Sequence, residues 1–225
     1  MSKKIFIILI LVGLLNISCQ SQKSDKAKQI NQKSAMVDLL KINFKNDLNT
    51  LLSYTNFTSA ESEFSEYLNA FTTKEVDSFK MGKSLFSSKY KVNDFEISND
   101  SYISFVTKNE NEEIIVVHIR TNYLGDEKKN YTYLKNMYGE PELLSVENSI
   151  NDLKGRRNYV WKNFKNDYSI LLSQISEGNI VPVNGEPSTK ANSDLIYIVN
   201  NYALIDYPNG QKEEILERLI KRFSE

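Results

Sequence analysis

The most restrictive feature of this sequence is that its 225 residues contain one cysteine, Cys19. A single cysteine cannot form a disulfide within the chain, so packing alone must hold the fold together. The chain supplies 13 tyrosines, 11 phenylalanines and one tryptophan. Because each buried aromatic side chain removes a large apolar area from water, we expect a core that is rich in aromatic residues.

Cys19 stands just after a short apolar stretch. Lys3 and Lys4 precede an apolar run of 11 residues, Ile5 to Leu15. At about 1.5 Å per residue such a helix spans about 16 Å, whereas a bilayer core of roughly 30 Å needs about 20 residues. A positive start, a short apolar run and small residues before a cleavage site are typical of a secretory signal peptide. The sequence therefore predicts export rather than a permanent membrane span.

The stretch Met1–Cys19 resembles the signal peptide of bacterial lipoproteins, which ends in a lipobox whose cysteine receives the lipid. Ser18, small and directly before Cys19, matches that pattern, whereas Asn16 stands where a leucine is usual and Leu15 lies one place further back. The resemblance implies that residues 1–18 are removed. It also implies that Cys19 carries diacylglycerol and a fatty acid such as palmitate, which would anchor the chain in the membrane of the cell envelope.

Residues 19–34 are polar and lack periodic apolar positions, a composition typical of a flexible tether. In the lipoprotein family the residue after the cysteine influences sorting, and Gln20 is not the aspartate linked to inner-membrane retention. The resemblance therefore implies the outer membrane, facing the periplasm or the exterior. The alternative interpretation is a plain signal peptide in which Cys19 is incidental.

The net charge of the chain limits the classes of partner that it can bind. Removal of residues 1–18 takes away two lysines and no acid, which leaves a formal balance of −3. A nucleic-acid-binding domain would show a basic patch or stripe, so we expect no nucleic-acid partner. The length allows one domain with a helical appendage.

Residues 35–74 are predicted to form that appendage, a helical hairpin. Apolar residues recur at three- and four-residue steps in Met36–Tyr54 and again in Ser59–Phe71, which is the period of an amphipathic helix. The polar segment Thr55–Thr58 would join the two helices.

Residues 75–225 are predicted to form an α+β domain with a mainly antiparallel sheet, an inserted helix and a C-terminal helix. Runs rich in β-branched and aromatic residues, separated by short polar segments, predict strands and hairpins. The expected strands are Tyr90–Val92, Phe95–Ile97, Tyr102–Thr107, Glu113–Thr121, Leu143–Val146, Asn158–Phe164, Tyr168–Ile175, Asp194–Asn200 and Leu204–Tyr207. The expected helices are Asp126–Tyr138, which Gly139 would end, and Lys212–Phe223.

No motif indicates a metal ion, a nucleotide or an activated nucleophile. The sequence lacks CxxC, HExxH, EF-hand, GxSxG, GxGxxG and Walker patterns, so we expect no cofactor and no metal. His118 is the only histidine and lies in a predicted strand. A lone histidine without a cysteine partner cannot complete a structural zinc site, and we interpret His118 as a structural or surface residue of that strand.

Carboxylate pairs are harder to exclude, because two acids can meet from distant positions to flank a glycosidic bond. Candidates lie beside predicted turns, where solvated charges are the simpler interpretation. They are Glu110, Glu112, Glu113, Glu140 and Glu142.

Three features could contribute a recognition surface. The basic turn Lys154–Arg157 could contact lipid head groups or an acidic partner, or be solvated. The long segment Ser176–Ser193, with two glycines and two prolines, is predicted to be an irregular loop, and such loops are often functional. A set of aromatic residues could form a recognition surface or cover the sheet: Tyr131, Tyr133, Tyr138, Tyr159 and Trp161.

We therefore expect a non-enzymatic module of the cell envelope that binds a protein, a peptide or an envelope component. The expectation rests on the predicted anchor and on the lack of catalytic motifs. Two alternatives remain open. One is a hydrolase of envelope polymers that uses unmarked carboxylates, and the other is an immunity or inhibitor lipoprotein that captures one protein.

Overall fold

The computed structural model describes residues 36–45, 48–92, 95–108, 113–124, 128–148, 155–163, 167–180 and 189–225. The chain divides into two compact units, Met1–Met36 and Val37–Glu225, and all the elements below belong to the second. The predicted signal peptide (residues 1–18), Cys19 and the predicted tether (residues 19–34) lie outside the described residues.

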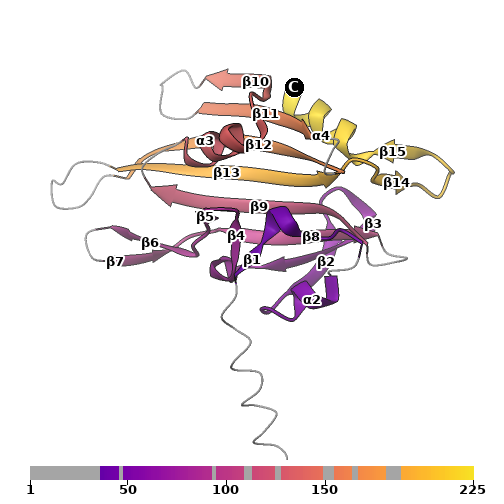
Figure 1. Ribbon diagram of the computed structural model, residues 1–225, viewed down its shortest axis with the longest axis horizontal. Coiled ribbons are helices and arrows are strands. Elements are labelled where there is room, and N and C mark those ends of the chain that lie inside the picture. The colour runs from indigo at the N-terminus through magenta and orange to yellow at the C-terminus, as the bar shows by residue number, and fades with distance from the viewer. Residues whose placement is uncertain are drawn as a thin grey trace, which may run out of the picture. The chain divides into compact units, whose positions relative to one another are not determined.

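An eight-stranded, entirely antiparallel sheet organises Val37–Glu225 (Figure 1). Its strand order is β10-β11-β12-β13-β9-β8-β3-β2, so β10 and β2 are the two edges. The strands are β2 (Thr58–Ser62), β3 (Ser65–Thr73), β8 (Tyr102–Lys108), β9 (Ile114–Leu124), β10 (Glu142–Asn148), β11 (Gly155–Asn163), β12 (Tyr168–Ile180) and β13 (Thr189–Asn200).

Side chains of the central strands alternate between two hydrophobic clusters, one on each face of the sheet. On β13, Ile196 and Ile198 belong to the first cluster and Tyr197 to the second. On β12, Ile170 belongs to the first cluster and Leu171 to the second. Successive side chains of a strand point to opposite faces, so these nearly continuous apolar runs require a cover on both sides.

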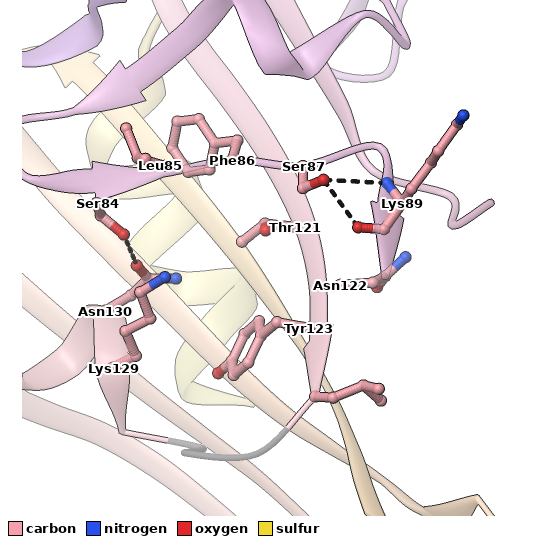
Figure 2. A pocket seen from close by; sticks show the side chains of 11 residues that line it. Ser84, Leu85, Phe86, Ser87, Lys89, Thr121, Asn122, Tyr123, Lys129 and Asn130 are labelled. Carbon is pink, nitrogen blue, oxygen red and sulfur yellow. Dashed lines mark hydrogen bonds between the residues drawn. The ribbon is translucent and has the colours of Figure 1, made fainter. Parts of the chain in front are cut away.

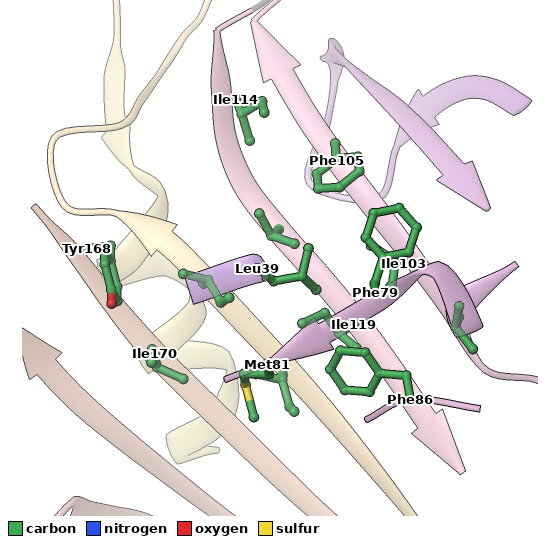
Figure 3. Packing of buried hydrophobic residues seen from close by; sticks show 14 of the residues in the cluster. Leu39, Phe79, Met81, Phe86, Ile103, Phe105, Ile114, Ile119, Tyr168 and Ile170 are labelled. Atoms are coloured by element: carbon green, nitrogen blue, oxygen red, sulfur yellow. The ribbon is translucent and has the colours of Figure 1, made fainter. Parts of the chain in front are cut away.

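The first face is covered by the N-terminal part of this unit and by α3 (Lys129–Tyr138). The N-terminal part contains a small sheet of β1 (Val37–Asp38), β4 (Phe79–Met81) and β5 (Ser84–Leu85), with helices η1 (Leu39–Lys41), α2 (Leu48–Leu52) and η2 (Val76–Ser78). Figure 3 shows Leu39, Phe79 and Met81 from these elements packed over Ile103, Phe105 and Ile119 of the large sheet. Fully burying one such side chain contributes roughly 1.5–3 kcal/mol.

Gly82 sits in the turn between β4 and β5, with a φ of 59°. A Cβ atom at this position would overlap the hydroxyl of Tyr133 on α3. The Gly82 N–H donates to Asp38 Oδ1 over 2.8 Å. Only glycine permits this close approach, which docks α3 against the small sheet.

The second face is covered by α4 (Ile215–Ser224) and by the hairpin of β14 (Leu204–Asp206) and β15 (Lys212–Glu214). Ile215, Leu216, Leu219 and Phe223 are buried on the sheet side of α4. Asn158 on β11 donates from Nδ2 to the carbonyl of Phe223 over 3.1 Å. This bond satisfies one of the carbonyls that a helix leaves without a partner at its C-terminal end.

Most elements predicted beyond residue 75 are confirmed. The strand pairs β8–β9 and β11–β12 form the expected antiparallel hairpins, and β6 (Lys89–Val92) pairs with β7 (Phe95–Ser98). The inserted helix α3 ends at Tyr138, the residue predicted from the position of Gly139. Gly139 has a φ of 85°, and its N–H donates to the carbonyl of Lys135 over 2.9 Å. The α+β class with a mainly antiparallel sheet is correct.

The predicted N-terminal helical hairpin is wrong for the described residues. Within Met36–Tyr54 the α-helix is limited to Leu48–Leu52, and Ser59–Phe71 lies in β2 and β3 with their connecting turn. Pairing with β8 along Leu68–Thr73 overrides the local period. The apolar residues of this segment can also be buried from a strand, on both faces of the sheet. Leu68 belongs to the second cluster, whereas Phe71 packs against the first.

The predicted irregular loop Ser176–Ser193 is mostly a long hairpin arm. β12 continues to Ile180 and β13 begins at Thr189, and these two residues pair. A register shift between Ser176 and Gly178 accommodates the glycine as a β-bulge. Residues 181–188 lie outside the described residues. Lys212–Glu214, predicted as helix, forms β15 instead.

Candidate functional site

His118 is buried on β9 and contacts three other side chains. Its Nδ1 lies 3.0 Å from Glu63 Oε1 and its Nε2 lies 3.3 Å from the hydroxyl of Tyr102. Its ring stacks on Tyr197 with a centroid distance of 4.2 Å. The hydrogen bond from His118 lowers the pKa of Glu63, although partial burial opposes the shift. The structure therefore places His118 in a contact between the sheet and the turn before β3, as the structural interpretation predicts.

Two of the acidic candidates, Glu140 and Glu142, lie close together in sequence, and each forms an ion pair with a lysine. Glu140 and Glu142 are 72% and 59% exposed, with oxygens 2.6 Å from Lys135 Nζ and 3.4 Å from Lys162 Nζ. Glu113 directly precedes β9, whereas Glu110 and Glu112 are outside the described residues. Among the residues that the structure describes, no group of three metal-ligating side chains occurs.

The predicted aromatic set is mainly a cover for the first face. Trp161 is 3% exposed and its Nε1 donates to the Gly139 carbonyl over 2.8 Å. Tyr131 lies 4.8 Å from Tyr159 and 6.0 Å from Trp161, measured between ring centroids. Tyr138 exchanges a hydrogen bond of 2.9 Å with Tyr168. Of the basic turn, Lys154 lies outside the described residues, and Arg156 and Arg157 lie on β11.

Strand β10 carries an exposed apolar surface at one edge of the sheet. Leu143 is 54% exposed and Val146 is 46% exposed. They pair with Tyr159 and Arg157, and a register shift between Leu143 and Ser145 places both on the same face. We call these two side chains, with the outer side of β10, the edge surface.

A groove of about 440 Å³ lies beside the edge surface. Its walls come from the end of α3, from the start of β10 and from β11, and Met137 in it is 57% exposed. The groove is lined by Met137, Tyr138, Glu140, Glu142, Val160, Trp161 and Lys162. The sequence predicts β10 as a strand, but only the sheet order shows that it is an edge.

A second feature, the polar cavity, lies among β5, the last residues of β9 and the start of α3 (Figure 2). Behind it, Asp194 on β13 is fully buried. Asn130 Nδ2 donates to Asp194 Oδ2 over 2.8 Å, and the Tyr123 hydroxyl donates to Asp194 Oδ1 over 3.1 Å. Burial raises the pKa of Asp194 to about 7, against the opposing effect of these two hydrogen bonds. Nothing in the local sequence pattern distinguishes Asp194 from a solvated strand residue.

None of the described helices is long and apolar enough to cross a membrane. No protein-family model, curated protein or solved structure matches this chain.

Proposed function

We propose that this chain is a membrane-anchored lipoprotein of the bacterial cell envelope and that its folded unit is a non-enzymatic module that binds a protein partner. Cys19 would carry the lipid, and residues 19–34 would tether the module to the outer membrane. The observation that carries the binding part of the proposal is the edge surface on β10.

An edge strand leaves half of its backbone N–H and C=O groups without a partner in the sheet, and natural proteins usually protect such edges. β10 has a register shift between Leu143 and Ser145, but it still presents Leu143 and Val146, which are 54% and 46% exposed. An extended segment of another protein can add to such an edge, where backbone hydrogen bonds provide affinity and side-chain contacts provide specificity. The partner segment is therefore extended, with apolar side chains on one face.

The neighbouring groove extends this surface towards α3. Exposed Met137 provides an adaptable apolar contact. The ion pairs of Glu140 and Glu142 with Lys135 and Lys162 form a polar rim of the kind that surrounds protein interfaces.

These contacts favour binding over the hydrolase alternative. A glycosidase needs two carboxyl groups facing each other across the scissile bond, whereas Glu140 and Glu142 each pair with a lysine. An immunity or inhibitor lipoprotein is a special case of the same proposal, in which one partner binds tightly.

Site-specific photocrosslinking in cells tests the edge surface. A photoreactive phenylalanine replaces Leu143 in the full chain, and the matched control replaces Leu85 on β5, which is 56% exposed. We expect a discrete adduct with another protein from position 143 and none from position 85. The additional substitution Val146→Asp should abolish the adduct.

Equal adducts from the two positions, or no adduct from position 143, would contradict the proposal. An adduct between two copies of this chain would also contradict it, because the edge would then serve self-association.

A further inference from the structure

The polar cavity has a volume of about 260 Å³, at the small end of the ligand sites found in proteins, which run from roughly 300 to 1,000 Å³. It is separate from the groove beside β10, and the two share no lining residue. Its walls come from β5 and the residues after it, and from the end of β9 together with the start of α3 more than 30 residues later (Figure 2).

A chain of buried hydrogen bonds fixes the groups that face the cavity. Asn130 is 3% exposed and Ser84 is 5% exposed. The Ser84 hydroxyl donates to Asn130 Oδ1 over 2.8 Å, while Asn130 Nδ2 donates to Asp194. The amide orientation of Asn130 is thus set at both ends. Asn130 keeps a second N–H donor, and the Ser84 oxygen keeps lone pairs that can accept.

Thr121 is the residue that most clearly indicates a ligand. It is 5% exposed and lines the cavity, and it lies between the Ser84–Asn130 pair and Ser87 in Figure 2. Its hydroxyl makes no hydrogen bond to the part of the chain that the structure describes. The hydroxyl is not among the fully buried polar atoms that lack a partner, so it is accessible from the cavity, where water or a ligand hydroxyl can bond to it.

The mouth of the cavity is cationic and its wall is partly aromatic. Lys89 and Lys129, both exposed, are the charged residues among those described as lining it. The Tyr123 ring also faces this space (Figure 2). Lysines attract an anionic group, whereas hydroxyl and amide groups inside suit the hydroxyls of a small ligand.

We propose that the polar cavity binds a hydroxylated carboxylate of the size of one sugar ring. Its hydroxyl groups would bond to Thr121, Ser84 and Asn130, and its carboxylate would face Lys129. This site is independent of the protein partner proposed for β10. A ligand of this size, bound with ordinary efficiency per atom, would have a dissociation constant of about 1 mM or lower.

Calorimetric titration of the full chain in detergent tests this proposal, with glucuronate as the probe. Glucose has the same ring and hydroxyls without the charge, and acetate has the charge without the hydroxyls. We expect glucuronate to bind at least about tenfold more tightly than glucose, because it adds a charge-assisted contact. We expect acetate to give no measurable binding.

Two variants locate the site. Thr121→Val removes the hydroxyl with little change in shape and should weaken glucuronate binding about fivefold or more. Thr132→Val, at an exposed position of α3 outside the cavity, should leave it unchanged. Lys129→Met alters only an exposed side chain, so it tests the site even if the Thr121 variant is poorly folded. It should reduce glucuronate binding to the level of glucose.

No glucuronate binding at about 20 mM, well above the expected dissociation constant, would overturn the proposal. Equal binding of acetate and glucuronate would overturn it too, since charge alone would then explain the signal. Unchanged affinity in both Thr121→Val and Lys129→Met would place any binding elsewhere.

Discussion

Asp194 is the residue whose surroundings most affect its chemistry. It is fully buried, and its carboxyl has a pKa raised to about 7 because burial disfavours the charged form. In an unfolded chain the carboxyl would ionise at its ordinary pKa of 3.8. Between these two pH values the folded chain holds a proton that the unfolded chain has released. The contribution of Asp194 to stability is therefore complete at low pH and is lost as the pH rises towards about 7.

Asp194→Asn should remove this pH dependence. The amide oxygen can accept from Asn130, and the amide nitrogen can donate to the oxygen of Tyr123. We expect the variant to exceed the wild type in free energy of unfolding above about pH 7.5, by up to about 4 kcal/mol. Urea denaturation at about pH 5 and pH 8 measures the difference. Asp206→Asn, which removes a carboxylate that is 54% exposed, serves as the control for the same substitution at an exposed position.

The importance of Asp194 could not be read from the sequence. Its partners Asn130 and Tyr123 lie 64 and 71 residues away, and a charged residue at the start of a predicted strand is normally solvated. The strand position of His118 followed from its apolar, β-branched neighbours. Its contact with Glu63 did not, because the sequence pattern placed Glu63 in a helix.

Among the elements, α3 has the boundary that the sequence predicts best. Gly139 adopts φ 85° and ψ −166°, a region that is almost exclusive to glycine. We expect Gly139→Ala to lower the free energy of unfolding by about 1–3 kcal/mol through backbone strain.

Gly155→Ala is the matched control for Gly139→Ala. Gly155 does not have a positive φ, and an added Cβ would lie 3.5 Å from the Glu147 carbonyl oxygen, an ordinary contact. Its effect should stay within about 0.5 kcal/mol. Chemical denaturation of both variants measures the contrast, and equal losses would refute the strain argument.

The prediction of secondary structure from local sequence was wrong where the same apolar residues fit both the helical and the strand period. Phe64, Tyr67, Leu68 and Phe71 repeat at helical spacing. In β3 the same segment pairs with β8 and sends Leu68 and Phe71 to opposite faces. The strand partner is a long-range contact that no window of local sequence contains. For the same reason the sequence predicted β10 as a strand without revealing that it ends the sheet.

At the scale of the whole molecule, the proposed anchor and the folded unit have complementary roles. The unit Val37–Glu225 covers both faces of its sheet but leaves Leu143 and Val146 of β10 exposed. A lipid on Cys19 would keep that surface near the membrane, at a distance limited by residues 19–34. Stable membrane attachment requires more than one acyl chain, as lipoprotein acylation provides.

The most direct test of this account is fatty-acid labelling of the expressed full chain, wild type against Cys19→Ala, together with membrane fractionation. The account predicts that the wild-type chain carries label and sediments with membranes. It also predicts that Cys19→Ala loses the label while the folded unit remains intact. An unlabelled wild-type chain, or label that persists in Cys19→Ala, would contradict the lipoprotein assignment.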